Sequence, residues 1–436
     1  MLDGRPLLEH VLDAVRTAGI EDVVVVLGHA ADEIEERIDW LSERRVRNPD
    51  PRHLSGSLQI GLAAVADIEP PVRAVLIALG DQPRTRPEVI RALLAASRDP
   101  ETPVILPHYS DGGGANPVLV RREAFGLIDE ATGDRGLGPI LAGDPNLVVE
   151  VPVAGSNPDI DVPADLMELA WAERVRANRE QVDRVREVPD GNDFYVPVSG
   201  LFRADPDRTN DPVLDALVGI AKPGETWLDI GAGAGRYALP LARVVDEVVA
   251  IEPSAGMLDG LSEGMTSHGI ANVQPIESRW PMIEPPTADV ALVAHLGYDV
   301  EAIGPFVAEM ERAAMRLCVV VLMERQPASL VDPFWPIVHG EARVGLPALG
   351  EFVELLHARG IDPTTTMTPR EPRRFASRDE IASFLRRQLW IADGGDKERR
   401  FLEAFEEHVV AAPDGTFGLA GQEPAAVGIV TWAPPN

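Results

Sequence analysis

Runs of apolar residues alternate with amphipathic segments along most of this chain, and they do so in two blocks. In the first block, apolar runs cover residues 22–28, 74–79, 104–106, 117–120 and 147–151, and helical spacing covers 7–18, 31–42, 56–66 and 88–96. Strands that are apolar on both faces are typical of parallel sheets that helices cover on both sides. The pattern therefore predicts an α/β fold for this block, with a doubly wound, mostly parallel sheet in three layers.

The second block repeats this pattern. Its apolar runs cover residues 226–230, 247–252, 272–277, 290–294 and 316–323, with helical segments between them. After Glu324 the alternation loosens, and we expect helices at 349–359 and 378–388 and a last strand at 426–432. A second doubly wound, three-layer sheet of the Rossmann-like kind is expected here, followed by a C-terminal region that forms a substrate-binding or lid part.

A long polar segment separates the two blocks. Residues 165–188 have helical character, and their later part is dense in charges of both signs. Such a helix is usually a solvated connector. The segment Pro189-Asp190-Gly191-Asn192-Asp193 then ends it. The predicted organisation is a first domain over residues 1–168, a helical linker over 169–192 and a second domain over 193–436.

Length and charge narrow the class of protein. A chain of 436 residues is too long for one ordinary core. A net charge of −30 argues against nucleic acid or an anionic membrane surface as a partner, because both require a positive face. The single cysteine, Cys318, excludes an intramolecular disulfide, and no apolar run is long enough to span a bilayer. We expect a cytoplasmic protein with a small-molecule substrate; the oligomeric state is not readable from the sequence.

One turn in the second block carries candidate chemistry. The strand 226–230 leads into Asp229-Ile230-Gly231-Ala232-Gly233-Ala234-Gly235, and a helix is expected over 236–245. Glycines let a ligand approach the main chain closely, which suits either a dinucleotide or S-adenosylmethionine. Asp229 would repel a pyrophosphate and attract the positively charged methionine end of S-adenosylmethionine. Arg236 stands where the dinucleotide pattern has a small residue, so both residues favour S-adenosylmethionine.

Acidic residues also end the next two strands. Glu252 lies at the carboxyl end of the strand 247–252, where a carboxylate can accept hydrogen bonds from both ribose hydroxyls. Glu277 ends the strand 272–277, where a polar group would meet the adenine edge. Either acid alone is as easily a capping or surface residue. Together with Asp229 and the glycines, they predict a cofactor site.

These residues resemble those of class I S-adenosylmethionine-dependent methyltransferases, over about residues 194–325. The resemblance implies a seven-stranded doubly wound sheet with the cofactor at the carboxyl ends of its strands. It also implies roles for individual residues in holding the cofactor, namely Asp229, Gly231, Gly233, Gly235, Glu252 and Glu277.

Fewer residues point to the place where the methyl acceptor binds. His295 follows the strand 290–294, at the sheet edge where ligands of open α/β folds bind. It can act as a general base, or it can be a structural histidine bonded to a neighbouring loop. Methyl transfer from a sulfonium can also proceed by positioning alone, without a base. His339, Glu341 and Arg343 are rival candidates in a segment that can roof the substrate site.

Six short motifs follow in order along the first block: Asp3 to Leu8, Asn48-Pro49 with Ser55 to Leu58, Leu79 to Pro83, Asn116 to Leu119, Gly133 to Gly136, and Asp159 to Leu166. Together they resemble the motifs of MobA-like nucleotidyltransferases, closest to the molybdenum cofactor cytidylyltransferase branch. The resemblance implies nucleotide binding by Asn48, Ser57, Asp81 and Asn116. It implies Mg²⁺ at Asp81, with Asp161 as a second acidic group.

This block departs from the family in one respect. The family opens with a strand and a glycine-rich loop that cradles the triphosphate, and the sequence begins at Met1 after the place where that loop ends. An inner strand of the sheet then has no sequence to form it, which predicts unpaired backbone groups beside it. We expect the start to be truncated and this domain to be inactive in the given form. Asn116 also stands where the family commonly has histidine.

The sequence therefore predicts a transferase: an S-adenosylmethionine-dependent methyltransferase fused to a nucleotidyltransferase-like domain of the CTP or GTP type. One alternative is a nucleotidyltransferase of molybdenum cofactor metabolism with an accessory S-adenosylmethionine-binding domain. Another is a regulatory module that only binds the two ligands. An NAD-dependent oxidoreductase is disfavoured by Asp229 and Arg236.

Overall fold

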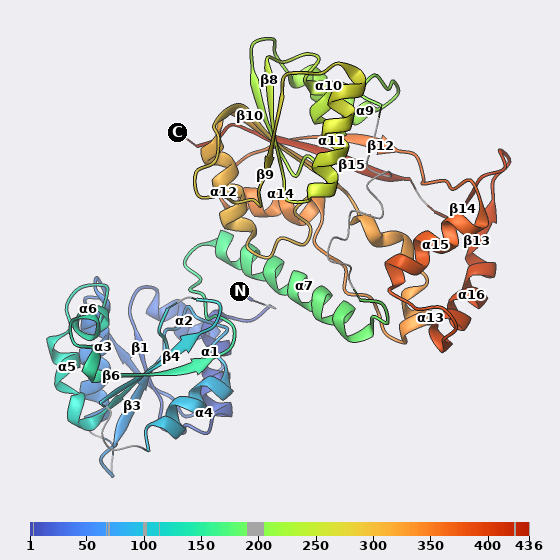
Figure 1. Cartoon of the computed structure of the whole chain (residues 1–436). Coiled ribbons are helices and arrows are strands. Elements are labelled where there is room, and N and C mark those ends of the chain that lie inside the picture. The colour runs from blue at the N-terminus through green and yellow to red at the C-terminus, as the bar shows by residue number, and fades with distance from the viewer. Residues whose placement is uncertain are drawn as a thin grey trace. The chain divides into compact units, whose positions relative to one another are not determined.

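A computed structural model describes residues 1–2, 4–66, 68, 70–98, 103–112, 114–189, 205–422 and 424–435 (Figure 1). The chain divides into two units, Met1–Asp165 and Leu166–Asn436. Both units are α/β, and parallel strand pairs predominate, so the predicted fold class is confirmed. None of the described helices is both long enough and apolar enough to cross a membrane.

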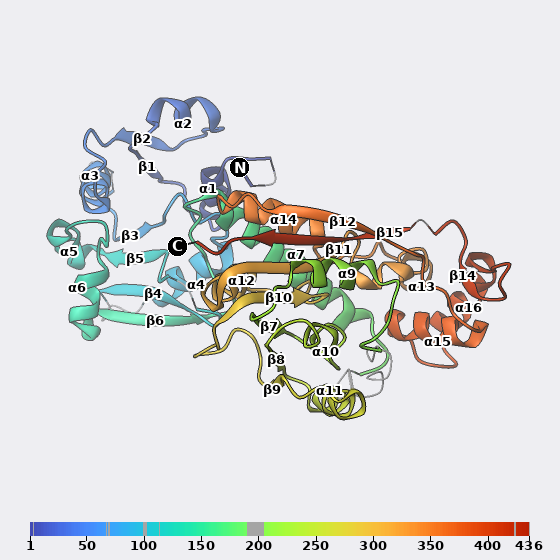
Figure 2. The same cartoon turned by 90° about the horizontal axis from the view of Figure 1, so that it is seen from above.

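The first unit contains two separate sheets (Figure 2). One sheet pairs β1 (Val24–Leu27) in parallel with β2 (Arg44–Arg47). The other has the order β3-β5-β4-β6, with β3 (Ala74–Ile77), β4 (Val104–Tyr109), β5 (Val118–Arg121) and β6 (Val148–Val153). β4 and β6 are parallel, whereas β5 runs antiparallel to both of its neighbours. A run as short as 117–120 is apolar in either direction, so its pattern could not reveal that reversal.

The helices of this unit are α1 (Leu7–Thr17), α2 (Ala31–Arg37), α3 (Leu54–Ala66), α4 (Pro87–Ala96), α5 (Gly126–Glu130) and α6 (Gly138–Gly143), with short 3-10 turns at Arg122–Ala124 and Pro145–Leu147. α2 lies beside β1 and β2 (Figure 2), and helices cover both faces of the larger sheet. Val104 and Val120 pack with Ile128 on one face. Ile105 and Leu119 pack with Leu93 of α4 on the other. Alternate strand residues thus face two helical layers, as a three-layer fold requires.

β1 and β3 each lie at an edge of a sheet. Among the strands that the structure describes, β1 pairs only with β2, and β3 pairs only with β5. The described strands of this unit therefore form two sheets rather than the single predicted sheet. β2 was not predicted, because Arg44-Arg45-Val46-Arg47 has three charged positions and no apolar alternation.

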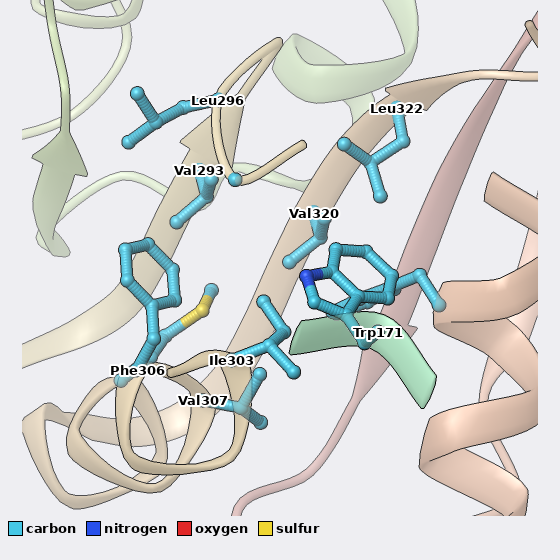
Figure 3. A pocket seen from close by; sticks show the side chains of 11 residues that line it. Trp171, Val293, Leu296, Ile303, Phe306, Val307, Val320 and Leu322 are labelled. Carbon is cyan, nitrogen blue, oxygen red and sulfur yellow. The ribbon is translucent and has the colours of Figure 1, made fainter. Parts of the chain in front are cut away.

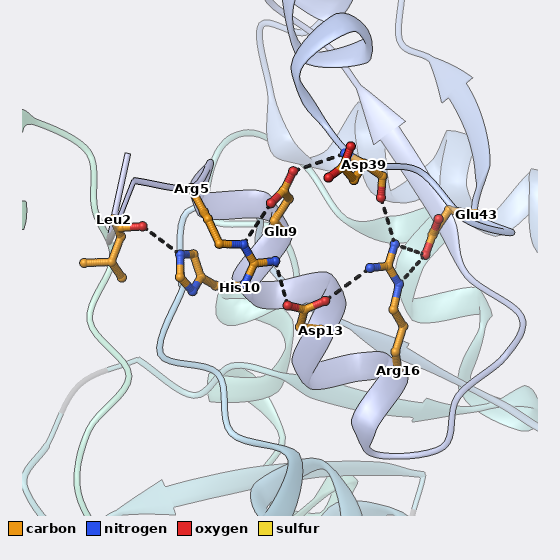
Figure 4. A network of polar contacts seen from close by, with 8 residues as sticks. All are labelled: Leu2, Arg5, Glu9, His10, Asp13, Arg16, Asp39 and Glu43. Atoms are coloured by element: carbon orange, nitrogen blue, oxygen red, sulfur yellow. Dashed lines mark hydrogen bonds and ion pairs between the residues drawn. The ribbon is translucent and has the colours of Figure 1, made fainter.

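A charged network fixes α1 to the segment before β2 (Figure 4). Arg5 pairs with Glu9 at 3.0 Å and with Asp13 at 2.7 Å. Arg16 pairs with Asp13 at 3.2 Å and with Glu43 at 2.6 Å. Because Glu43 is buried, its charge requires such a partner. The network holds α1 against the chain that enters β2.

The second unit contains one seven-stranded sheet with the order β12-β15-β11-β10-β7-β8-β9. Its strands are β7 (Thr226–Ile230), β8 (Glu247–Glu252), β9 (Val273–Glu277), β10 (Ala288–Ala294), β11 (Ala314–Met323), β12 (Thr364–Arg370) and β15 (Ala425–Trp432). β15 is antiparallel to both of its neighbours, and the other pairs are parallel. The chain order reverses between β7 and β10, the position at which open α/β sheets bind ligands.

Two helical layers sandwich this sheet. One layer contains α9 (Pro212–Ile220), α10 (Ala238–Leu241) and α11 (Ala255–His268), and its core includes Leu217, Leu239 and Leu261. The other contains α12 (Ile303–Ala313), α14 (Leu349–Ala358) and part of α7 (Pro163–Val185), and its core includes Trp171, Phe306 and Leu355. α10 is shorter than the predicted helix 236–245, because the chain turns again at Ala242.

The long helix α7 packs on the second unit and is not a solvated connector. Trp171 is only 4% exposed, and its indole N–H donates to the Val300 carbonyl at 2.9 Å. Trp171 borders a cavity of about 10 Å³ in the apolar core, which is no larger than a water molecule requires (Figure 3). The charges that suggested a solvated helix pair with acidic residues distant in sequence, including Arg184 with Glu341 at 2.7 Å.

Segments that precede and follow β12 in the chain together form a helical insert (Figure 1). It contains η4 (Pro327–Val331), α13 (Trp335–His339), α15 (Arg378–Leu389), α16 (Asp396–His408), β13 (Val409–Ala411) and β14 (Phe417–Leu419). Phe334, Trp335, Phe401 and Phe405 form its separate core. The insert lies in the region for which the sequence predicts a substrate-binding or lid part.

Candidate functional sites

The glycine turn after β7 is shaped by close contacts. Gly231 has φ +75°, and a Cβ there would lie 2.8 Å from the Leu296 side chain. Gly235 has φ +84°, and a Cβ there would lie 2.6 Å from Leu261 and 2.8 Å from Leu239. Gly233 also has a positive φ, of +57°, but its surroundings are open. The outer glycines are therefore required by packing, while the open side of Gly233 leaves the main chain accessible to a ligand.

Glu252 is fixed beside this turn. Its Oε2 accepts a hydrogen bond from the Gly233 amide at 3.0 Å, and its Oε1 accepts one from the Ser254 amide at 2.9 Å. β8 pairs with β7 up to Ile251, so Glu252 is the first residue beyond the paired stretch. Glu277 stands opposite Glu252 in the pairing of β8 with β9, and it is exposed.

Asp229 lies beneath the turn, with 2% of its surface exposed. Burial raises the pKa of this carboxyl to about 7, the nearby Glu252 carboxylate contributes to the rise, and a hydrogen bond from the Ala238 amide opposes it. A buried carboxylate without a cation is costly. Two acidic groups at one turn therefore create a site that favours a positively charged ligand.

His295 reaches the same edge of the sheet from β10, the strand that pairs with β7 on its other side. It has φ +58°, and its amide donates to the Val321 carbonyl at 2.8 Å. Its Nε2 lies 3.2 Å from the Tyr237 hydroxyl. Burial, followed by the positive charges of Arg370 and Arg236, lowers the pKa of His295 to about 4. The imidazole is therefore neutral at neutral pH.

Sequence reasoning missed the groups that surround His295. Tyr237 stacks with the guanidinium groups of Arg208 and Arg236, whose Cζ atoms lie 5.7 and 5.5 Å from the ring centre. Asp211 pairs with both arginines, at 2.9 and 3.3 Å. The tyrosine that follows the glycine turn was the available signal. Its partners come from segments too distant in sequence to be foreseen.

The rival residues of the second block lie in or beside the helical insert. The Nε2 of His339 lies 3.1 Å from the Leu389 carbonyl, and burial is the main cause that lowers the pKa of His339 to about 4. Glu341 pairs with Arg184 on α7, and Arg343 pairs with Asp332. These contacts join parts of the fold to one another, and none involves the glycine turn.

In the first unit, acidic groups gather where the chain leaves β3. One oxygen of Asp81 is buried and has no hydrogen-bond partner in the described part of the chain. Burial raises the pKa of Asp81, and the charges of Asp159 and Asp161 add to this rise. Gln82 donates to Asp159 at 2.7 Å. Asp159 was quoted only as part of a motif, and the structure adds it to the group. A buried carboxylate oxygen with acidic neighbours fits the ligand preference of Mg²⁺.

Two hydrogen bonds involve predicted nucleotide residues, and one of them joins two of these residues to each other. The Asn48 amide donates to the Ser57 hydroxyl at 3.0 Å. The Asn116 carbonyl accepts from the Tyr109 hydroxyl at 2.9 Å. Asn116 also lines a cavity of about 540 Å³, whose other walls are mostly apolar and include Leu58 and Leu106. That volume is in the range of small-molecule sites.

Comparison with known proteins identifies both units. Residues 1–149 match the model of the MobA-like NTP transferase domain, and residues 228–316 match the model of a methyltransferase domain. Among curated proteins, the chain is 32% identical over 133 residues to the bifunctional protein GlmU of Sorangium cellulosum, covering 29% of this chain and 28% of that protein. GlmU of Cellvibrio japonicus is 30% identical over 131 residues, covering 29% and 27%. The chain thus spans less than a third of these relatives.

Among solved structures, the manganese complex of a Mycobacterium tuberculosis protein is 26% identical, covering 37% of this chain and 84% of that chain with a TM-score of 0.34. A putative methyltransferase from Bacillus halodurans is 13% identical, covering 52% and 100% with a TM-score of 0.38. The two domain matches follow the same order as the two units. The chain therefore carries a MobA-like NTP transferase domain at residues 1–149 and a methyltransferase domain at residues 228–316.

Proposed function

We propose that the second unit transfers a methyl group from S-adenosylmethionine to a small-molecule acceptor. The observation that carries this proposal is the placement of Asp229 and Glu252 on either side of an open glycine turn, at the carboxyl edge of the sheet. A dinucleotide would bring its pyrophosphate to this turn, and the two acidic groups would repel it. A sulfonium and an ammonium group are attracted there instead.

Each site residue has a part in this proposal. Glu252, already oriented by two backbone amides, accepts hydrogen bonds from the ribose hydroxyls. Asp229 supplies the negative charge beneath the methionine end, and Glu277 meets the adenine edge. S-adenosylmethionine supplies an electrophilic methyl group, so the protein mainly has to align the acceptor.

His295 contributes a hydrogen bond to the acceptor in this proposal. With a pKa of about 4 it is a weak base at neutral pH, so orientation of the acceptor suits it better than proton removal. Its neutral ring and its position at the end of β10 support contact with the reacting groups.

Calorimetry tests the cofactor assignment directly. We expect the full chain to bind S-adenosylmethionine and S-adenosylhomocysteine and to give no heat with NADH. Heat with NADH and none with S-adenosylmethionine would overturn the proposal. A Glu252→Gln variant that has lost most of its affinity would locate the binding at this turn.

For the first unit, we propose a nucleotide-binding role with Mg²⁺ held by Asp81 and Asp161, without turnover in the present form. Asn48, Ser57 and Asn116 are the proposed contacts to the nucleotide. The separation of β1 from β3 supports the absence of turnover, because Asn48 and Asp81 follow strands of two different sheets. Incubation with CTP or GTP and Mg²⁺ tests this, since release of pyrophosphate would contradict it. The predicted first domain over residues 1–168 is part of the same proposal, whereas the predicted linker over 169–192 is not kept, because α7 packs on the second unit.

A further inference from the structure

Positively charged side chains gather around His295, on the side of the glycine turn where Tyr237 lies. Arg208 and Arg236 share one carboxylate, that of Asp211. Arg370, at the carboxyl end of β12, lies close enough to lower the pKa of His295 and has the Met323 sulfur as a contact, at 3.6 Å. Asp229 and Glu252 act on each other at the turn, whereas the positive charges that act on His295 are opposed by that of Asp211.

Three hydrogen-bonding atoms in this group are buried and unused. Arg208 Nη2, Arg236 Nε and His295 Nδ1 have no hydrogen-bond partner among the described residues. Arg208 and His295 are linked by Tyr237, whose ring stacks on Arg208 and whose hydroxyl reaches His295 Nε2. A buried donor without an acceptor costs free energy, unless a ligand supplies the acceptor.

The contact with Tyr237 determines what His295 can offer. Burial raises the pKa of Tyr237, so its hydroxyl stays protonated and is able to donate to His295 Nε2 or to accept from it. With the Tyr237 hydroxyl as the donor, the proton of the neutral ring is on Nδ1, because only one ring nitrogen carries it. In this tautomer His295 Nδ1 is a donor, as the unused arginine nitrogens are. All three unused atoms then require an acceptor with negative charge or lone pairs.

The position of Arg370 indicates which molecule supplies this acceptor. β12 lies three strands from β10 and four from β7 in the sheet order, on the side away from the ribose acid Glu252. Positive charge thus extends from the glycine turn toward the far strands of the sheet. A group that meets both Arg208 and Arg370 must reach beyond the cofactor turn.

We propose that the methyl acceptor is an anion whose carboxylate or phosphate group binds among Arg208, His295 and Arg370. This inference rests on the proposed methyltransferase function and names the chemical class of its substrate. Arg236 adds a third positive charge, and Asp211 pairs with both Arg208 and Arg236. Guanidinium groups and a neutral imidazole N–H are suited to both carboxylate and phosphate oxygens.

The test uses the full chain saturated with S-adenosylhomocysteine and titrated with inorganic phosphate and, separately, with acetate, at ionic strength held constant with sodium chloride. We expect one of the two anions to bind, and Arg208→Gln and Arg370→Gln each to weaken that binding about tenfold or more, the size of a lost charged hydrogen bond. The better-bound anion identifies phosphate or carboxylate as the recognised group. Arg312→Gln, on α12 across the sheet, is the matched control and should bind the anion as the wild type does.

Three results would overturn the proposal. Phosphate and acetate would bind no better than chloride, or both arginine variants would bind as tightly as the control. The third result concerns the affinity for the cofactor. Wild-type protein binds decarboxylated S-adenosylmethionine more weakly than S-adenosylmethionine by some factor, and Arg208→Gln would weaken the binding of S-adenosylmethionine by that same factor. The arginine would then serve the cofactor and not the acceptor. Failure of S-adenosylhomocysteine to bind is a separate result against the methyltransferase function, and anion binding to the cofactor-free protein would still report on the anion site.

Discussion

The Glu252 carboxylate accepts a hydrogen bond from the Gly233 amide at 3.0 Å, which ties the end of β8 to the middle of the glycine turn after β7. The same carboxylate also accepts from the Ser254 amide at 2.9 Å. Two amides therefore orient the acid before any ligand arrives. Such preorganisation reduces the ordering cost of binding.

Replacement of Glu252 by glutamine should weaken S-adenosylmethionine about tenfold to a hundredfold, because hydrogen bonds to a charged group contribute about 1.5–3 kcal/mol. The amide oxygen of glutamine can still accept from Gly233, so the turn should keep its shape. Calorimetry of the purified variant measures the loss. Glu247→Gln, at the exposed amino end of the same strand, is the control and should keep its affinity. Equal losses at both positions would contradict the ribose assignment of Glu252.

Binding of the cationic cofactor should release a proton from Asp229. The pKa of this carboxyl is about 7 in the free protein, so it is partly protonated at pH 6 to 7. A positive charge above it favours the carboxylate and lowers its pKa. Affinity should therefore rise with pH up to about pH 7 and then level off. Calorimetry in two buffers of different ionisation enthalpy measures the released protons. Asp229→Asn should bind more weakly with no proton release from this site, and an unchanged proton release in the variant would refute the assignment.

The same group makes stability depend on pH in the opposite direction. Its folded pKa of about 7 lies above the ordinary value of 3.8, so the folded unit holds the proton more tightly than the unfolded chain does. The stabilisation is complete below pH 3.8 and is lost as the pH rises through 7. In urea denaturation between pH 5 and 8, the free energy of unfolding of the wild type should fall as the pH rises, and Asp229→Asn should lack the part of this fall that comes from Asp229. A variant that declines as steeply as the wild type would show that another group is responsible.

The sequence pattern predicted the strands and the glycine turn at this edge of the sheet because its information is local. Apolar runs marked the parallel strands, and residues at their carboxyl ends, such as Asp229, Glu252 and His295, must lie at one edge of the sheet. The structure places these three near one another. Chain order alone thus predicted much of this edge.

Features that depend on distant contacts were not predictable. Phe334 packs against Phe401 in the helical insert, at a ring-centre distance of 5.7 Å, and no periodicity specifies which amphipathic helix meets which. The charges on α7 led to the prediction of a solvent-exposed helix, because their acidic partners are far away in the sequence. The link from Arg208 through Tyr237 to His295 also joins three separate segments.

A pair of glycine substitutions separates backbone strain from steric contact in the turn. Gly233→Ala should cost about 1–2 kcal/mol, because its φ is positive and its surroundings are open. Gly235→Ala should cost about 1–3 kcal/mol more, because its Cβ would lie within 2.8 Å of both Leu261 and Leu239. Urea denaturation gives the free energy of unfolding for each. Equal costs would mean that the leucines move aside.

Removal of the Asp81 carboxylate should weaken divalent-cation binding in the first unit. The buried, unpartnered oxygen of Asp81 and the nearby charges of Asp159 and Asp161 form the proposed site. Mn²⁺ titration followed by electron paramagnetic resonance should show a bound ion in the wild type and a loss of about tenfold or more in affinity for Asp81→Asn. Asp50→Asn, which removes an exposed partner of Arg52, is the control. A bound ion that persists in Asp81→Asn would place the metal elsewhere.

Truncation of Trp171 tests whether α7 is part of the second unit's core. The indole is almost fully buried and donates to the Val300 carbonyl, so Trp171→Ala should cost about 3–5 kcal/mol. Trp171→Phe keeps most of the ring volume and should cost less, because it loses mainly the hydrogen bond. Native-state hydrogen exchange can assign the loss to one unit, because peptides from β10 and β11 should exchange faster in Trp171→Ala while those from β4 and β5 stay protected. Faster exchange confined to α7 itself would mean that the helix packs on the sheet without supporting it, and the methyltransferase fold would then be complete without α7.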